Sequence, residues 1–280
     1  MQKISNILDK IDKGTTDLEF LKTGFPTIDE QLDGGFMRKE LIVIGAKTGF
    51  GKSFIAGQLM LNIARARYST AYFSLEISNE MVVSRLAGSI ANIKPTRIRA
   101  GLLSLEELGR KNSAENELRS YEDLMSFSDD LYQLQEIVEE IKENHYDFVV
   151  IDFVQNIFAK AQDDVAKLNQ ISLDLQKLAK EENCCILLLS QFSTAVQKES
   201  LTSPDIHYKG SGGIKTACDL GFMLHREPYV EGQTYQDIHL ILNKNRRGVS
   251  GLTFDLLYRH PGGEIIERLD DSYPNTPVRM

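Results

Sequence analysis

The chain has 280 residues, of which 42% are hydrophobic and 26% are charged, so it can bury a full core as one large domain. No apolar run approaches the roughly 20 residues of a membrane span, and the N-terminus lacks the apolar core of a signal peptide, so a cytoplasmic location is expected. The formal net charge of −8 argues against a protein that coats nucleic acid with its whole surface, so any polyanion site must be local.

The first predicted element is a short helix. Apolar residues at positions 4, 7, 8 and 11 form a stripe at helical spacing, followed by a polar run. So short a helix is not stable alone, so the stripe is expected to dock either on the body of this chain or on a neighbouring copy.

From residue 41 onward, short apolar runs alternate with helical patterns. The first four runs are apolar throughout, which is typical of a parallel sheet covered on both faces, whereas the last two indicate an antiparallel meander at one edge. The fold class is therefore predicted to be α/β, doubly wound, with a mostly parallel sheet and an antiparallel edge. Strands are expected at 41–44, 70–75, 148–151, 186–189, 221–224, 238–242 and 252–257, and helices at 54–66, 79–91, 105–120, 131–143 and 165–182.

Between the first strand and its helix lies the segment AKTGFGKS, residues 46–53. A glycine-bearing turn at a helix N-terminus directs several backbone N–H groups at one spot, which suits a phosphate chain. Lys52 adds charge and Ser53 a magnesium ligand. The strict pattern has glycine at position 46, yet the strand, turn and helix context favours a nucleoside triphosphate site over an ordinary turn with a solvated lysine. The predicted nucleotide-binding residues of this loop are Ala46, Lys47, Thr48, Gly49, Phe50, Gly51, Lys52 and Ser53.

Three polar residues follow other predicted strands, and such strand ends gather at one edge of a doubly wound sheet. Asp152 can reach a magnesium ion or its water shell beside Ser53, although an aspartate here can also be a turn former. Glu76 can orient and activate an attacking water, or it can be a solvated loop glutamate. Gln191 can bond the γ-phosphate or that water, or it can be an ordinary loop amide.

The late segment HLILNKNRRG carries two cations on one strand face. Lys244 and Arg246 are two residues apart and therefore project from the same side. Such a pair can brace a transferring γ-phosphoryl group, or it can simply blunt an edge strand by charge. Because Lys52 already supplies a cation within the chain, the pair is better placed to reach the nucleotide of a neighbouring subunit.

The three cysteines Cys184, Cys185 and Cys218 have no metal-type spacing, and their odd number argues against a disulfide framework. They are expected to be buried small hydrophobic residues.

With these residues in hand, the chain resembles the ATPase domain of the DnaB-type replicative helicases, within the RecA-like class. The resemblance covers an entry segment and phosphate loop ending in GAKTGFGKS, then FSLEISNE, FVVIDFVQNI, LLLSQFS, HYKGSGGIKTACD and NKNRRG, in family order from about residue 21 to about residue 269. It implies ATP and Mg²⁺ as cofactors, a linker helix and connector at 1–20 and a RecA-like motor domain at 21–280.

The resemblance also assigns roles to the residues above. It implies that Ser53 and Asp152 hold the metal, that Glu76 is the base, and that Gln191 senses the γ-phosphate. Lys244 and Arg246 become the cations supplied in trans. Arg246 is preferred to Arg247 as the finger because it shares the face of Lys244 and fits the family's spacing, but Arg247 stands where the family usually has asparagine, so the choice stays open. The DNA-binding residues implied within 203–215 are Lys209, Gly210, Gly212, Gly213 and Lys215.

The family implies a homo-oligomer, a hexameric ring around single-stranded DNA, with 5′ to 3′ movement and with primase and a helicase loader as partners and no membrane. Family members usually carry an N-terminal collar domain, and this chain begins almost at the linker helix. An alternative function is a RecA-like DNA-binding ATPase, a recombination mediator or switch, without unwinding activity. A further alternative is an accessory ring component that needs another protein.

Overall fold

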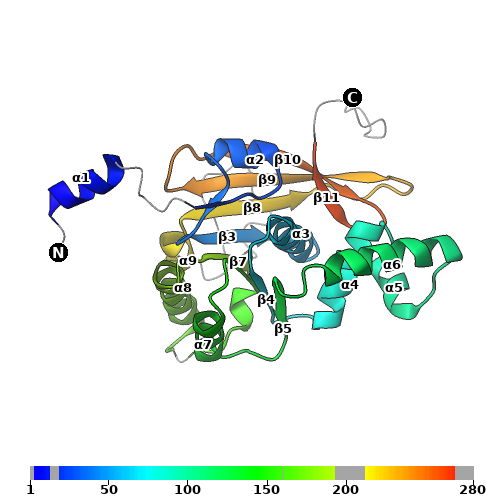
Figure 1. Cartoon of the computed structure of the whole chain (residues 1–280), viewed down its shortest axis with the longest axis horizontal. Helices are drawn as coiled ribbons and strands as arrows, with labels where there is room; N and C mark the ends of the chain where they lie inside the picture. Colours follow the sequence, from blue (N-terminus) through cyan, green and yellow to red (C-terminus); the bar gives the residue numbers. More distant parts are fainter. Residues whose placement is uncertain (1–2, 13–18, 160, 193–211, 269–280) are drawn as a thin grey trace.

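The computed structural model describes residues 3–12, 19–159, 161–192 and 212–268 (Figure 1). Its centre is a nine-stranded sheet with the order β11-β10-β9-β8-β3-β7-β6-β4-β5. The strands from β8 to β5 run parallel and the strands from β9 to β11 are antiparallel, so the predicted fold class is confirmed. The sheet strands are β3 (Leu41–Ala46), β4 (Thr70–Ser74), β5 (Met125–Ser128), β6 (Phe148–Asp152), β7 (Cys185–Gln191), β8 (Leu220–Arg226), β9 (Tyr235–Asn245), β10 (Leu252–Arg259) and β11 (Glu264–Glu267).

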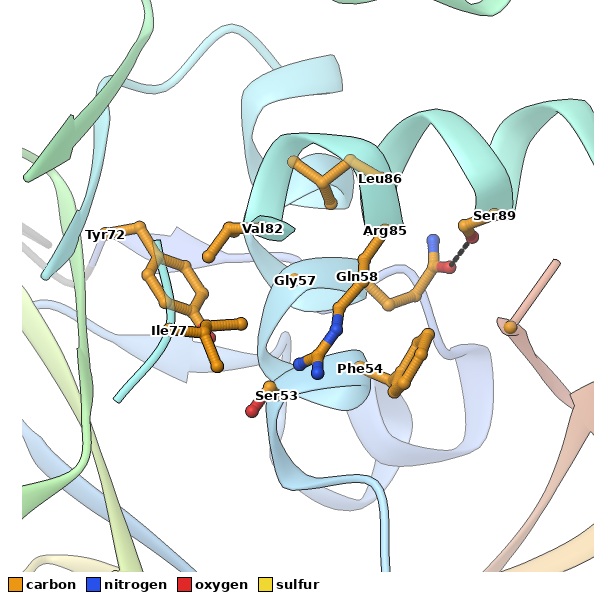
Figure 2. A pocket seen from close by; sticks show the side chains of 11 residues that line it. Ser53, Phe54, Gly57, Gln58, Tyr72, Ile77, Val82, Arg85, Leu86 and Ser89 are labelled. Atoms are coloured by element: carbon orange, nitrogen blue, oxygen red, sulfur yellow. Dashed lines mark hydrogen bonds between the residues drawn. The ribbon is translucent and has the colours of Figure 1, made fainter. Parts of the chain in front are cut away.

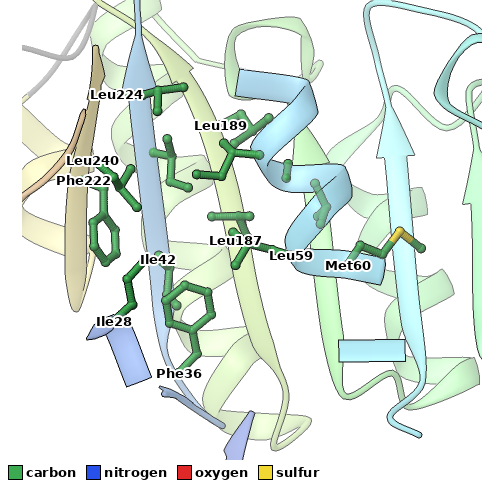
Figure 3. Packing of buried hydrophobic residues seen from close by; sticks show 14 of the residues in the cluster. Ile28, Phe36, Ile42, Leu59, Met60, Leu187, Leu189, Phe222, Leu224 and Leu240 are labelled. Atoms are coloured by element: carbon green, nitrogen blue, oxygen red, sulfur yellow. The ribbon is translucent and has the colours of Figure 1, made fainter. Parts of the chain in front are cut away.

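Two hydrophobic layers cover the two faces of this sheet. Alternation along β3 sends Ile42 and Ile44 to one layer and Leu41 and Val43 to the other. The first layer holds α3 (Lys52–Arg65), and Figure 3 shows its residue Leu59 packed toward Leu187 of β7. The second layer holds α7 (Leu134–Asn144), α8 (Asp164–Glu181) and α9 (Gly212–Ala217).

The helical excursion between β4 and β5 lies beside the first layer. It consists of α4 (Asn79–Ala91), α5 (Pro95–Ala100) and α6 (Leu105–Arg119), which project from one end of the molecule (Figure 1). Ser104 begins α6 with a capping box, since its hydroxyl accepts from the Glu107 N–H while the Glu107 carboxylate accepts from the Ser104 N–H. Ser78 begins α4, but its side chain makes no cap hydrogen bond.

Several short elements were not predicted. They lack a clear apolar period of their own. The short strands are defined by pairing with other strands, as Met125 of β5 pairs with Thr70 of β4. The additional elements are β1 (Phe20–Leu21), α2 (Pro26–Gln31), β2 (Phe36–Met37), α5, β5, α9, the 3₁₀ turn η1 (Val154–Asn156) and β11.

The predicted N-terminal helix is present as α1 (Ile4–Asp12). Its residues Ile4 and Leu8 are 75% and 51% exposed, and Figure 1 shows the helix apart from the sheet. These two residues of the stripe are therefore not covered by the described body of their own chain, which favours a neighbouring copy as their partner. The three cysteines are buried and unpaired, as expected. Within the described residues, no helix has the length and apolar content needed to cross a bilayer.

Candidate functional site

The phosphate loop joins the carboxyl end of β3 to the first turn of α3. Gly49 and Gly51 have φ of 83° and 95°, values that favour glycine, and Gly51 is the N-cap residue directly before α3. Ala46 is fully buried as the last residue of β3, and its φ is not positive. Alanine therefore fits the position at which the strict pattern has glycine, because its methyl group joins the core.

Lys52 lies in the interior of this loop and is only 8% exposed. Its Nζ donates to the Ala46 carbonyl at 3.3 Å. Burial lowers the Lys52 pKa, and the nearby Asp152 and Glu76 oppose that shift. The lysine is therefore a desolvated cation facing two carboxylates, an arrangement suited to binding a polyphosphate.

The predicted strand-end residues do converge on this loop. A cavity of about 160 Å³ is lined by Lys52 and Ser53 together with Glu76, which follows β4, and Gln191, the last residue of β7. The Gln155 side chain ties the neighbouring strand ends together, since its Nε2 donates to Ser190 Oγ at 3.0 Å and its Oε1 accepts from the Gln191 N–H at 3.4 Å. The roles assigned to Glu76 and Gln191 stay predictions.

Asp152 ends β6 and is 1% exposed. Its Oδ2 accepts a 2.8 Å hydrogen bond from the Tyr72 hydroxyl, while its buried Oδ1 has no hydrogen-bond partner among the described residues. Burial raises the pKa of Tyr72, and the adjacent Asp152 carboxylate raises it further, whereas contact with Ser53 lowers it. Tyr72 thus touches both predicted magnesium ligands, and the free carboxylate oxygen is the kind of donor that a hard cation binds.

Two arginines that were not predicted line the same cavity. Arg85 reaches from α4 with its guanidinium 5.0 Å from the centre of the Phe54 ring, and Figure 2 shows it directed toward Ser53 and Phe54. Arg226 ends β8, and its guanidinium lies 3.7 Å from the centre of the Tyr258 ring. Arg226 follows the apolar run 221–224, so the strand-end argument applied to Asp152 could have found it. Arg85 lies on a helix and gave no such signal.

The basic pair, Lys244 and Arg246, lies at the end of the sheet opposite the phosphate loop. Gly221 pairs with Lys244, and Leu220, at the start of β8, pairs with Ile42 of β3. Ile42 is four residues before Ala46 on β3, on the order of 13 Å along the strand. Lys244 and Arg246 therefore do not face the phosphate loop of their own chain.

Both cations are bonded to the end of α9. Lys244 Nζ donates to the carbonyls of Lys215, Thr216 and Cys218, at 3.2 Å for Thr216 and 2.6 Å for Cys218. Arg246 donates to Asp219 Oδ1 at 2.9 Å and to the Thr216 carbonyl at 2.5 Å. The two side chains point in the same direction, as their spacing predicted. Burial lowers the pKa of Lys244.

Arg247 points elsewhere, into its own chain. Its guanidinium donates to the carbonyls of Leu32 and Gly35, each at 3.0 Å, and its Nε lies 2.9 Å from Glu40 Oε1. Its side chain is 19% exposed, against 43% for Arg246. Of the two candidates for a trans-acting finger, this geometry favours Arg246.

Replacing Arg247 with alanine is therefore expected to destabilise the fold by about 2 to 4 kcal/mol, because Glu40 and two carbonyls lose their partner in a buried setting. Chemical denaturation of Arg247→Ala, with Arg246→Ala as the matched variant, measures this difference. Equal losses of unfolding free energy in the two variants would contradict the distinction between the two arginines.

The predicted DNA-binding residues are only partly described. Lys209 and Gly210 lie outside the described residues, whereas Gly212, Gly213 and Lys215 belong to α9. A Cβ at Gly213 would lie 1.9 Å from the Asn169 side chain of α8, so close packing of α9 against α8 requires a glycine at this position. A Cβ at Gly212 would meet nothing within 4 Å among the described residues.

Comparison with known proteins gives a consistent set of similarities. Residues 21–261 match the family model described as the DnaB-like helicase C-terminal domain. The replicative DNA helicase DnaB of Treponema pallidum is 32% identical over 257 residues, which are 88% of this chain and 56% of that protein. The DnaB of Geobacillus stearothermophilus is 27% identical over 246 residues, 82% of this chain and 53% of that protein. The chain thus spans about half the length of these curated relatives.

Solved structures show the same fold. One of them, described as an ATPase domain, superposes with a TM-score of 0.84 at 22% identity, covering 96% of this chain and all of that one. A DnaB-like replicative helicase, described with its interactions with primase, has a TM-score of 0.81 at 22% identity, over 94% of this chain and 65% of that one. A KaiC-like protein from Pyrococcus horikoshii has a TM-score of 0.62 at 15% identity, over 90% of this chain and all of that one. The fold is RecA-like.

Proposed function

Since this chain belongs to the family of DnaB-like helicase C-terminal domains, we propose that it is the motor of an ATP-dependent replicative DNA helicase, which moves on single-stranded DNA as a ring and unwinds duplex. Residues 21–280 would form the motor and residues 1–20 a linker helix and connector. The observation that carries the proposal is the position of Lys244 and Arg246 at the end of the sheet opposite the phosphate loop, where they do not face the loop of their own chain.

On the phosphate-loop side, the proposed binding residues are those of the loop 46–53. Lys52 would neutralise phosphate charge in a desolvated setting. Ser53 and Asp152 fit a magnesium ion, because Asp152 Oδ1 is buried without a hydrogen-bond partner in the described part of the chain. Magnesium, when bound there, would supply charge neutralisation between the phosphates.

The remaining carboxylate and amide have separate proposed roles. Glu76 would accept a proton from the attacking water, and Gln191 would hydrogen-bond that water or the γ-phosphate. Both side chains line the cavity beside Lys52, which supports these assignments. Lys244 and Arg246 of an adjoining copy would complete the site by stabilising charge on the transferring phosphoryl group.

Ring formation supplies that adjoining copy. A closed ring of identical subunits places the same two half-sites at every interface, and six subunits is the number that the family implies. The stripe of α1, in which Ile4 and Leu8 are exposed, would dock on a neighbouring subunit. Single-stranded DNA would pass along the segment 203–215, with Lys209 and Lys215 supplying sequence-independent contact to phosphates. Primase and a helicase loader are the proposed protein partners.

A forked duplex with a single-stranded 5′ tail tests the proposal. With ATP and Mg²⁺, the protein is expected to displace the complementary strand, and single-stranded DNA is expected to stimulate hydrolysis. Displacement should weaken as salt rises, because the contacts are to the DNA backbone. Hydrolysis that DNA does not stimulate, with no strand displacement on either polarity of fork, would instead favour a RecA-like recombination mediator or switch.

A further inference from the structure

The two motifs assigned to DNA contact and to trans chemistry meet at one place, the end of α9. Lys215 belongs to the proposed DNA segment, and its own carbonyl accepts a hydrogen bond from Lys244 Nζ. Thr216, the next residue, accepts from both Lys244 and Arg246. The last carbonyls of a helix lack partners within the helix, so these two cations satisfy groups that would otherwise need water.

These bonds occupy all three donors of Lys244 and two of the five donors of Arg246. An ammonium group has three N–H donors, and Lys244 has three carbonyl acceptors at the end of α9. In Arg246, one terminal nitrogen donates to Asp219 and the other to Thr216. Arg246 keeps three further N–H groups, whereas Lys244 can bind a phosphoryl group only after at least one of its carbonyl bonds opens.

Asp219 is the anchor of this arrangement. It is 9% exposed, and its Oδ2 accepts from the backbone N–H of Leu41, the first residue of β3. Its Oδ1 accepts from Arg246, and its own carbonyl accepts from the Arg246 N–H at 3.0 Å. The carboxylate is thus held by the central strand of the sheet while it holds the exposed guanidinium.

We propose that Asp219 is a positioning residue that keeps Arg246, and with it Lys244, docked on the end of α9 until the triphosphate of a neighbouring subunit draws the pair away. Departure of the pair removes five hydrogen bonds from the segment 215–219, all within or directly after the helix that ends the DNA segment. Occupancy of one nucleotide site would in this way loosen the DNA segment of the subunit that supplies the cations. This inference rests on the proposed function.

The substitution Asp219→Asn tests it with a change of one atom. The remaining oxygen can still accept from the buried Leu41 N–H, which then leaves an amide N–H₂ facing Arg246 in place of a carboxylate. Hydrolysis without DNA is expected to rise roughly threefold to fivefold, the change that a partly exposed ion pair can produce. Stimulation by single-stranded DNA should fall by the same factor, because the docked state has already been weakened.

Two further variants separate this role from a loss of packing. Gln176 donates from Nε2 to the Ala217 carbonyl at 2.5 Å and to Asp219 Oδ1 at 3.4 Å. Gln176→Ala therefore loosens the same helix end but keeps the carboxylate and its bond to Arg246, and it should change the ratio of rates with and without DNA far less than Asp219→Asn does. The double variant Asp219→Asn with Arg246→Ala should hydrolyse ATP at the rate of Arg246→Ala alone. A wild-type ratio in Asp219→Asn, or a gain that persists without Arg246, overturns the inference.

A second measurement uses the unaltered protein, so it decides the matter even if Asp219→Asn does not fold. Amide hydrogen exchange of the peptide 212–219 should be faster with a non-hydrolysable ATP analogue than with ADP. Equal exchange in the two states overturns the inference. Failure of the proposed function looks different, since the wild-type protein would then hydrolyse no ATP, or would hydrolyse it equally well after Arg246→Ala.

Discussion

Lys52→Ala is expected to abolish ATP hydrolysis, with kcat lowered by roughly a thousandfold or more, while the protein stays folded. The loss follows from the position of the ammonium group, which is buried beside Asp152 and Glu76 and donates to the Ala46 carbonyl. With the lysine removed, the phosphate charge would face the carboxylates of the buried Asp152 and the exposed Glu76 without that compensating cation.

The fold should tolerate this change because burial already disfavours the charged lysine, as its lowered pKa indicates. The melting temperature of Lys52→Ala should therefore equal or exceed that of the wild type. Steady-state hydrolysis and thermal unfolding are measured on the same sample, with the exposed Lys22→Ala as a matched loss of one positive charge. A normal hydrolysis rate in Lys52→Ala would defeat the assignment of the phosphate loop.

Arg246→Ala should depress turnover far more than nucleotide affinity. A guanidinium that acts on the transition state is worth about three orders of magnitude in kcat in phosphoryl transfer, whereas KM for ATP should change little. Arg259→Ala is a suitable control, because Arg259 makes a comparable ion pair with Glu264 at 2.7 Å on the same antiparallel edge. That variant should retain normal kinetics.

Mixing the two inactive variants tests whether Arg246 acts between subunits. A mixed ring contains interfaces at which an intact Lys52 from one subunit meets an intact Arg246 from its neighbour, so partial activity should return. Verified mixed rings that remain inactive would argue that Arg246 acts within its own chain. The position of Arg246, at the end of the sheet opposite Ala46, makes the action between subunits the expected result.

Most of the fold could be predicted because its long elements carry their own pattern. The apolar runs that became β3, β6 and β7 have no alternative to burial, and the phosphate loop is recognisable because Gly49 and Gly51 must adopt positive φ. Strand-end reasoning also brought Glu76 and Gln191 to the cavity of Lys52. The short elements β5, β11 and α9 were missed because they depend on pairing or packing with other elements and have no local sequence pattern of their own.

The candidate site, like the fold, was predicted from the sequence only in part. Spacing predicted that Lys244 and Arg246 share a face and so favoured Arg246 over Arg247, but it left the choice open because it could not show the different surroundings of the two arginines. That distinction depends on Glu40 and on the Leu32 and Gly35 carbonyls, which hold Arg247 across the fold. Arg85 was missed because a lone arginine on a helix has no local feature that indicates which cavity it faces.

The amino-acid sequence by itself determined the order of strands and helices and the chemistry of the phosphate loop, because alternation, glycine conformation and residue type are local properties. Only the tertiary structure decided which groups compete for the same donor. Asp219, Thr216 and Arg246 meet because β8 and β9 pair in one register, and a register of distant strands is set by packing across the whole sheet.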